Sequence, residues 1–302
     1  MNRSPKLARP DQKKTQSAIG AELAQLLRPG QSIALLKQLH ILTREGKLNQ
    51  DSRRKLKQVY HLYQFIEKLL LELEGQAEAA DRVGHEGLTL ADHGAGKSYL
   101  GFILYDLFFE HRSVGHIFGI EARPELVKQS QDLAAALGFS RMSFVNASVS
   151  ESVSRGDLPD RIDVVTALHA CDTATDDAIA FGLQKHARYM VLVPCCQAEM
   201  ARVLSQHKAL SLSKTPLAEL WRHPLHTREF GSQLTNVLRC LYLESKGYQV
   251  TVTELVGWEH SLKNELIIAR FTGQAKSSAR RRLDELLSDF GLQSIQASRY
   301  PA

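Results

Sequence analysis

A glycine-rich turn is the segment of this sequence whose residue types and spacing most clearly suggest chemistry. Residues 88–98 (LTLADHGAGKS) read as an apolar strand that runs into a glycine turn and then into a helix. Glycines let the backbone approach a ligand closely, and unpaired backbone N–H groups collect where a helix begins. The turn therefore predicts a ligand site, with Asp92, Gly94 and Gly96 as candidate binding residues.

Three classes of ligand use turns of this kind. A nucleoside triphosphate needs a complete P-loop, but Ala91 stands where that motif requires its first glycine. A dinucleotide needs a third glycine, and Tyr99 stands at that position. S-Adenosylmethionine carries no phosphate, and its amino group suits an acid such as Asp92 just before the glycines. The spacing therefore favours S-adenosylmethionine as cofactor.

The ends of the next two apolar segments carry polar side chains. Residues 116–121 (HIFGIE) predict a strand that ends in Glu121. At that position a carboxylate can accept hydrogen bonds from both ribose hydroxyls of a bound nucleoside; capping of the helix after Pro124 is the alternative. Asn146 ends the following strand, and it either bonds the adenine edge or serves as a turn residue.

Two later apolar segments end in histidine, cysteine and aspartate. These segments are 168–172 (LHACD) and 193–197 (VPCCQ). Neighbouring parallel strands bring their carboxyl ends to one crevice, so we expect these side chains to converge beside the cofactor. The candidate catalytic residues are His169, Asp172, Cys195 and Cys196, and His169 is also expected to contact the cofactor.

This group of side chains allows more than one chemistry. His169 is the candidate general base for a hydroxyl or amine acceptor, with Asp172 orienting it or binding the acceptor; a core histidine bonded to a backbone carbonyl is the alternative. Cys195 or Cys196 could instead add to a pyrimidine ring, or both could be small buried residues. Zinc held by these groups and Cys171 is a third possibility, but adjacent cysteines chelate poorly and we expect no metal.

The elements that position these residues alternate between strand and helix from residue 88 onward. Strands are predicted at 88–92, 116–121, 142–146, 163–169 and 189–194. Helices are predicted around 97–110, 124–137, 173–186 and 197–207. Such alternation is typical of an α/β protein in which helices cover both faces of a mainly parallel sheet.

The C-terminal part of the pattern predicts a hairpin. A helix at 228–246 leads into strands at 248–256 and 266–271. The connection between these strands is too short for a crossover helix, so the two should pair antiparallel. Five parallel strands closed by an antiparallel hairpin form the Rossmann-like sheet of class I methyltransferases.

Taken together, the motifs resemble one branch of the class I S-adenosylmethionine-dependent methyltransferases, which includes a eukaryotic tRNA ribose 2′-O-methyltransferase. The resemblance covers roughly residues 88–271. It rests on the acid and glycines of the turn, on L-H-x-C after the fourth strand, on P-C-C after the fifth, and on Lys263-Asn264 before the last strand. It implies the class I fold, S-adenosylmethionine as cofactor, and methyl transfer near His169 and Cys195.

The sequence also departs from that branch. Asp172 stands where relatives often have glycine, and Ser98 stands where the glycine turn often continues with another glycine. The cysteine fingers that accompany the tRNA enzyme are missing from this sequence, so the resemblance does not carry over a substrate.

Positive charge is concentrated at the N-terminal end. The net charge is +5, yet residues 1–70 hold 14 lysines and arginines against 5 acidic residues. Helices are predicted at 12–27, at 32–43 and from Asp51 or Ser52 onward, with a linker at 75–87. Basic residues crowd the first turns of the third helix, against its dipole, which suggests an anionic partner. RNA phosphates would suit this segment, and a solvated helical surface is the alternative.

Composition sets the class of protein. Hydrophobic residues make up 43% of the chain and charged residues 24%, which excludes a disordered or collagen-like chain. The apolar runs are too short to span a bilayer, and 4 cysteines suit a reducing compartment, so we expect a cytoplasmic protein with no membrane partner.

We expect a basic helical extension (1–87), a methyltransferase domain (88–275) and a basic C-terminal helix (276–302). The expected function is S-adenosylmethionine-dependent methylation of RNA. Methylation of a protein or small molecule, or non-catalytic RNA binding on the same fold, are the alternatives.

Overall fold

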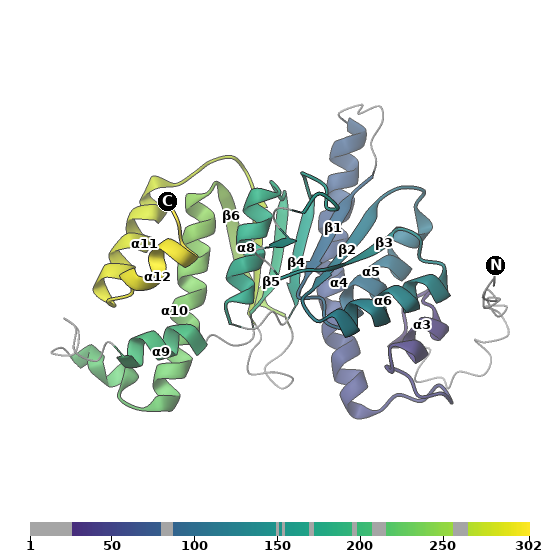
Figure 1. Cartoon of the computed structure of the whole chain (residues 1–302), viewed down its shortest axis with the longest axis horizontal. Helices are drawn as coiled ribbons and strands as arrows, with labels where there is room; N and C mark the ends of the chain where they lie inside the picture. Colours follow the sequence, from purple (N-terminus) through teal and green to yellow (C-terminus); the bar gives the residue numbers. More distant parts are fainter. Residues whose placement is uncertain are drawn as a thin grey trace. The chain divides into compact units, whose positions relative to one another are not determined.

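The computed structural model describes residues 26–79, 87–148, 151–152, 155–168, 172–194, 198–206, 216–255 and 265–302. The chain divides into two compact units, Met1–Ser148 and Val149–Ala302 (Figure 1). Each unit is described by itself below.

The first unit begins with helices α3 (Ile33–Gln38) and α4 (Gln50–Ala79). The Ser32 side chain accepts the Leu35 N–H and so starts α3. Asn49 does the same for α4 by accepting the Ser52 N–H at 2.7 Å. The predicted helix start at Asp51 or Ser52 was therefore one or two residues late, and the predicted helix 32–43 is shorter than expected.

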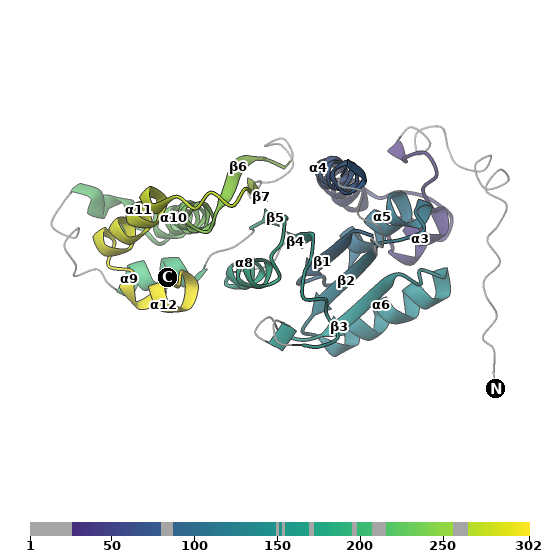
Figure 2. The ribbon, with the colours of Figure 1, turned by 90° about the horizontal axis from the view of Figure 1, so that it is seen from above.

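Helix α4 is held by one apolar face. Its buried residues recur at helical spacing and are Leu56, Val59, Tyr60, Tyr63, Ile66, Leu70 and Leu73. The helix packs against α5 (Tyr99–Leu107), and Figure 2 shows α4 end-on beside that helix. It runs on to Ala79, so the start of the predicted linker at Gly75 was wrong. Most of the predicted helix 12–27 lies outside the described residues.

Three parallel strands form the sheet of the first unit. They are β1 (Thr89–His93), β2 (His116–Glu121) and β3 (Met142–Asn146), in the order β3-β2-β1. The short 3-10 helix η1 (Phe109–His111) and α6 (Pro124–Leu137) complete the connections. Asp92 lies opposite Gly119, and Glu121 lies opposite Asn146, so the predicted polar residues stand at the carboxyl ends of adjacent strands.

The second unit contains four strands in the order β4-β5-β7-β6. These are β4 (Val164–Leu168), β5 (Tyr189–Val193), β6 (Tyr248–Glu254) and β7 (Glu265–Phe271). Strand β5 is a continuous apolar run and is buried throughout, as expected for a strand covered on both faces. It pairs parallel with β4 and antiparallel with β7, and β6 pairs antiparallel with β7.

Helices surround these four strands in the chain order of the second unit. They are α8 (Ala174–Gln184), α9 (Ala198–Gln206), the 3-10 helix η3 (Pro216–Trp221), α10 (Pro224–Ser245), α11 (Ser277–Asp289) and α12 (Gln293–Arg299). The sequence predicted one C-terminal helix. Gly291 adopts a φ of 66° and separates two helices instead.

The predicted fold class is confirmed. Five strands pair in parallel within their units, an antiparallel hairpin follows near the C-terminus, and helices precede the first strand. This is the strand complement of a Rossmann-like class I methyltransferase sheet. Within the described residues, no helix combines the length and apolar character that a bilayer crossing requires.

Candidate cofactor site and strand-end loops

The glycine turn folds back onto the end of β2. Gly94 and Gly96 have φ values of 67° and 59°, in the left-handed region that glycine adopts without strain. Ser98 shares this conformation with a φ of 52°. The turn brings the Gly96 N–H within 2.7 Å of Glu121 Oε2. Two residues predicted to bind the cofactor, from two different strands, are therefore in direct contact.

Hydrogen bonds surround the Glu121 carboxylate. Its Oε1 accepts the Arg123 backbone N–H at 3.0 Å and the Arg123 Nε–H at 2.9 Å. Its Oε2 accepts the Gly96 N–H and the Arg123 Nη2–H at 3.2 Å. Burial alone would raise the pKa of Glu121, but these bonds outweigh it and hold the pKa below its usual range. The group is therefore an anion at neutral pH.

The strand β1 ends in two buried polar residues. Asp92 and His93 are each 2% exposed. Burial lowers the pKa of His93 to about 4, although the negative charge of Glu121 raises it. His93 is therefore a neutral imidazole at neutral pH. The sequence reasoning overlooked this residue, and its place between the acid and the first glycine was the available signal.

Asn146 supports the turn that follows β2. Its Nδ2 donates to the carbonyl oxygens of Glu121, at 3.1 Å, and of Ala122, at 2.9 Å. Both bonds hold the backbone on which Glu121 sits. This geometry corresponds to the turn role that the sequence left open for Asn146.

The two strand ends of the second unit leave the sheet at the same level, because Leu168 of β4 lies opposite Val193 of β5. The residues that follow directly, His169, Cys171, Cys195 and Cys196, lie outside the described residues, as do Lys263 and Asn264. Their geometry is therefore untested.

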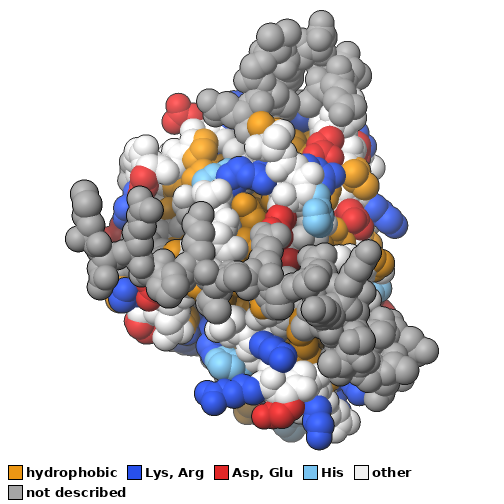
Figure 3. All heavy atoms as spheres, turned by 90° about the vertical axis from the view of Figure 1, so that its right-hand side faces the viewer, with side chains coloured by type: hydrophobic (Ala, Val, Ile, Leu, Met, Phe, Trp, Pro, Cys, Tyr) orange, Lys and Arg blue, Asp and Glu red, His pale blue; other side chains and the backbone are white. Residues whose placement is uncertain are grey.

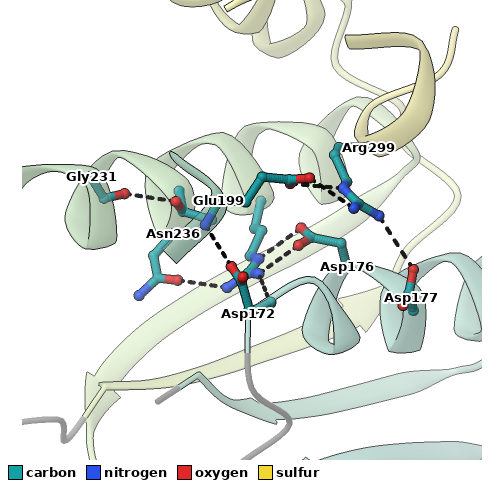
Figure 4. Close-up of polar contacts among 9 residues, drawn as sticks. Asp172, Asp176, Asp177, Glu199, Gly231, Asn236 and Arg299 are labelled. Atoms are coloured by element: carbon teal, nitrogen blue, oxygen red, sulfur yellow. Dashed lines mark hydrogen bonds and ion pairs between the residues drawn. The ribbon is translucent and has the colours of Figure 1, made fainter. Parts of the chain in front are cut away.

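Asp172 connects the far ends of these two segments. Its Oδ1 accepts the Glu199 backbone N–H at 2.9 Å, as Figure 4 shows. Asp172 follows segment 169–171 directly, and Glu199 stands in the first turn of α9, just after segment 195–197. The residues that border the two motif segments are therefore joined on both sides, by strand pairing and by this bond.

A buried arginine holds Asp172 from behind. Arg239 of α10 is fully buried and donates through Nε and Nη2 to the Asp176 carboxylate, at 2.8 and 2.6 Å. Its Nη2 also donates to the Asp172 carbonyl oxygen at 2.9 Å. Arg239 Nη1 bonds Asn236 Oδ1 at 3.1 Å, and Asn236 Nδ2 reaches Glu265 at the start of β7 at 2.6 Å (Figure 4). Through this network α10 is tied to both β4 and β7.

An outer ion pair continues the network. Arg299 of α12 donates to both carboxylate oxygens of Glu199 at 2.9 Å and approaches Asp177 at 3.6 Å (Figure 4). Sequence reasoning overlooked Arg239 and Arg299. For Arg239 the available signal was an arginine set among the apolar residues Leu238 and Tyr242 of a helix.

In the part of the chain that the structure describes, no three histidine, cysteine or acidic side chains gather to hold a metal ion. The four residues weighed as zinc ligands all lie outside that part.

The residues around the glycine turn fit S-adenosylmethionine. A Cβ atom added at Gly96 would meet nothing closer than Arg123 Nη2, at 3.8 Å, so space is open beside the turn. Two buried acids match a ligand that carries an ammonium group and a ribose diol. They would repel a triphosphate, and this disfavours the P-loop alternative on electrostatic grounds.

Comparison with known proteins gives one family match. Residues 54–203 match the family model of a methyltransferase domain. A curated relative, the glutathione S-transferase C-terminal domain-containing protein homolog of Drosophila pseudoobscura pseudoobscura, is 24% identical over 233 residues. That match covers 69% of this chain and spans only 37% of the relative's length.

Similar solved structures are distant in sequence. Magnesium protoporphyrin IX methyltransferase from Synechocystis PCC 6803, with bound SAH, is 12% identical with a TM-score of 0.43, over 79% of this chain and 94% of that one. The SAH-bound Podospora anserina methyltransferase PaMTH1 is 11% identical with a TM-score of 0.43, over 87% and 97%.

The matched segment contains the glycine turn, Glu121 and both strand-end motifs, and the residues of the turn suit the same cofactor. The chain is therefore an S-adenosylmethionine-dependent methyltransferase with the class I fold, and its residues 54–203 carry the matched methyltransferase domain.

Proposed function

We propose that the chain methylates RNA and holds S-adenosylmethionine at the glycine turn. The hydrogen bond between the Gly96 N–H and Glu121 carries this assignment, because it unites the turn and the second-strand acid in one site. Asp92 accepts the amino group of the cofactor, and Glu121 accepts the ribose hydroxyls. Gly94 and Gly96 let the cofactor lie against bare backbone.

Asn146 and His169 complete the proposed cofactor site. Asn146 acts through the backbone after β2, because both bonds of its Nδ2 go to carbonyl oxygens there. His169 follows β4, whose end is adjacent to the end of β5 in the second unit.

For the chemical step we propose that His169 removes the proton of the acceptor. Methyl transfer from a sulfonium is an in-line displacement, so much of the acceleration can come from positioning. The bond from the Glu199 N–H to Asp172 supports a positioning role for Asp172, between the two motif segments. Cys195 and Cys196 are the candidates for a second chemistry, in which a thiolate adds to a pyrimidine ring.

RNA is the proposed substrate, and the cytoplasm the proposed location. The support is the excess of basic residues in the first 70 positions, together with the resemblance to the branch that includes a tRNA ribose methyltransferase. On this proposal the extension, residues 1–87, binds phosphates and residues 88–275 carry out the transfer.

Methyl-labelled S-adenosylmethionine tests the substrate class. The purified protein is incubated with the cofactor and with RNA, protein and small-molecule fractions of a cell extract in parallel. We expect label in the RNA fraction that ribonuclease releases, and a matching modified nucleoside that is lost from cells without the protein. Label that only protease releases would refute the RNA assignment.

Substitution of the motif residues tests the acceptor chemistry. We expect His169→Ala to abolish turnover while cofactor affinity falls only modestly. Full turnover in His169→Ala, together with loss in Cys195→Ala or Cys196→Ala, would refute the base assignment in favour of thiolate addition.

A further inference from the structure

Two adjoining cavities lie on the first unit. One, of about 520 Å³, lies between the end of α3, the residues Lys97 and Tyr99, and the middle of α6. The other, of about 550 Å³, is bordered by the loop between α3 and α4. Gln38 and His40 line both cavities, so the two form one open groove, which we call the basic groove.

Cations dominate the charged residues of the basic groove. Its lining includes Lys37, Arg44 and Lys97, together with His40. Asp132 is the acid in the lining, and it pairs with Lys128 at 3.3 Å.

Charges next to the groove have the same balance. Glu45 lies in the loop beside it and interacts with Lys47 and Lys37. Residues 37–57 as a whole contain seven basic and two acidic side chains. Figure 3 looks onto the side of the chain that carries α3 and α6, where several Lys and Arg side chains are exposed. A polyanion would gain electrostatic attraction along this surface.

Ring side chains accompany these cations. Lys55 Nζ lies 4.2 Å from the centroid of the Tyr99 ring, in a cation–π contact. His40 is exposed where the two cavities meet, and it has a φ of 54° in the left-handed region. Sites for single-stranded nucleic acid combine cations that track phosphates with rings on which bases stack. An acidic peptide would use the cations but not the rings.

The groove reaches the glycine turn. Lys97 lines the groove, and it follows Gly96, whose N–H bonds Glu121. A strand held in the groove would therefore pass beside the turn assigned to the cofactor.

We propose that the basic groove binds a single-stranded segment of the RNA substrate, with phosphates on Lys37, Arg44 and Lys97 and bases near His40 and Tyr99. This inference rests on the proposed RNA methylation, and it names the surface that would hold the RNA.

Fluorescence anisotropy with a labelled oligouridylate of about 12 nucleotides, a length within the range of known single-strand sites, tests this proposal. The variants are Lys37→Glu, Arg44→Glu and Lys97→Glu in the full chain, measured over a series of KCl concentrations. Lys68→Glu is the matched control, because it reverses an exposed charge on α4 outside the groove. Thermal unfolding of each variant confirms that it is folded.

Each groove variant should weaken binding by at least about fivefold. The slope of log K against log salt should become shallower by about 0.7 for each phosphate contact that is lost. Lys68→Glu should stay within about twofold of the wild type. Equal effects of groove and control variants would overturn the proposal. Displacement of the RNA by polyglutamate as efficiently as by unlabelled RNA would also overturn it, in favour of an acidic protein partner.

The methyl-transfer assay separates the two proposals. RNA binding through the groove without transfer to any RNA would refute RNA methylation and leave the groove assignment standing. Methylation of RNA by groove variants that bind as tightly as the wild type would refute the groove alone.

Discussion

Replacement of Arg123 by alanine should strengthen the binding of S-adenosylmethionine. A carboxylate has about four acceptor positions. In Glu121 the N–H groups of Gly96 and Arg123 fill two of them, and the Arg123 guanidinium fills the other two, at 2.9 and 3.2 Å. The ribose of the cofactor also needs two positions. The guanidinium must therefore release Glu121 when the cofactor binds, while both backbone donors remain.

The size of the effect follows from exposure. The Arg123 side chain is 61% exposed, whereas that of Glu121 is 8% exposed. Ion pairs with so much solvent access contribute about 0.2–1 kcal/mol. Removal of the guanidinium should therefore tighten cofactor binding by up to about fivefold at 25 °C. Because salt screens the pair, the wild-type affinity should approach that of Arg123→Ala as ionic strength rises.

Isothermal titration calorimetry measures this difference directly. Lys128→Ala is the matched control, since it also breaks an ion pair of an exposed side chain in the first unit, the pair with Asp132. That control should leave cofactor affinity unchanged. Weaker binding by Arg123→Ala would refute the reasoning, because it would show that the guanidinium contacts the cofactor. Glu121→Gln should lose affinity whether or not Arg123 is present.

Three further predictions concern the buried polar residues. His93 is about 4 in pKa when folded and 6.5 when unfolded, so the unfolded chain binds more protons between these values. The free energy of unfolding should therefore fall by about 3 kcal/mol from this residue as pH drops from 6.5 to 4, a slope that His93→Gln should lack in urea titrations; an unchanged slope would contradict the burial effect. Arg239→Met should cost about 3–5 kcal/mol by leaving the Asp176 carboxylate buried and unpaired, and Arg239→Met with Asp176→Leu should recover most of that stability; no recovery would contradict the pairing. Asp172→Ala should cost about 1–2 kcal/mol through the lost bond from the Glu199 N–H, whereas Asp172→Asn should keep it; turnover lost in Asp172→Asn at full stability would show a catalytic rather than positioning role.

Much of the fold was predictable because its signals are local. The bounds of β2 and β3 match the prediction residue for residue, since each is a short apolar run with a polar end. The end of α4 was not predictable, because the helix passes through Gly75. A hydrogen bond from Gln76 to Glu72, at 2.8 Å, and the buried Leu73 keep it helical there. Glycine costs about 1 kcal/mol in a helix, which tertiary burial can offset.

The candidate site divides in the same way. Asp92, the glycines and Glu121 follow from one contiguous motif and one strand end, and the structure joins Gly96 to Glu121 as that pattern requires. The role of Arg239 depends on Asp176, which lies 63 positions away in the sequence and meets it only after folding. No spacing rule in the sequence predicts such a pair.

The account depends on one cofactor site, and calorimetric titration of S-adenosylmethionine against the wild type and Asp92→Asn tests it most directly. The wild type should bind the cofactor and ignore ATP with magnesium. Asp92→Asn should bind it at least about tenfold more weakly, because a charged hydrogen bond is lost. Equal affinity in Asp92→Asn, or binding of magnesium ATP in place of S-adenosylmethionine, would contradict the central claim.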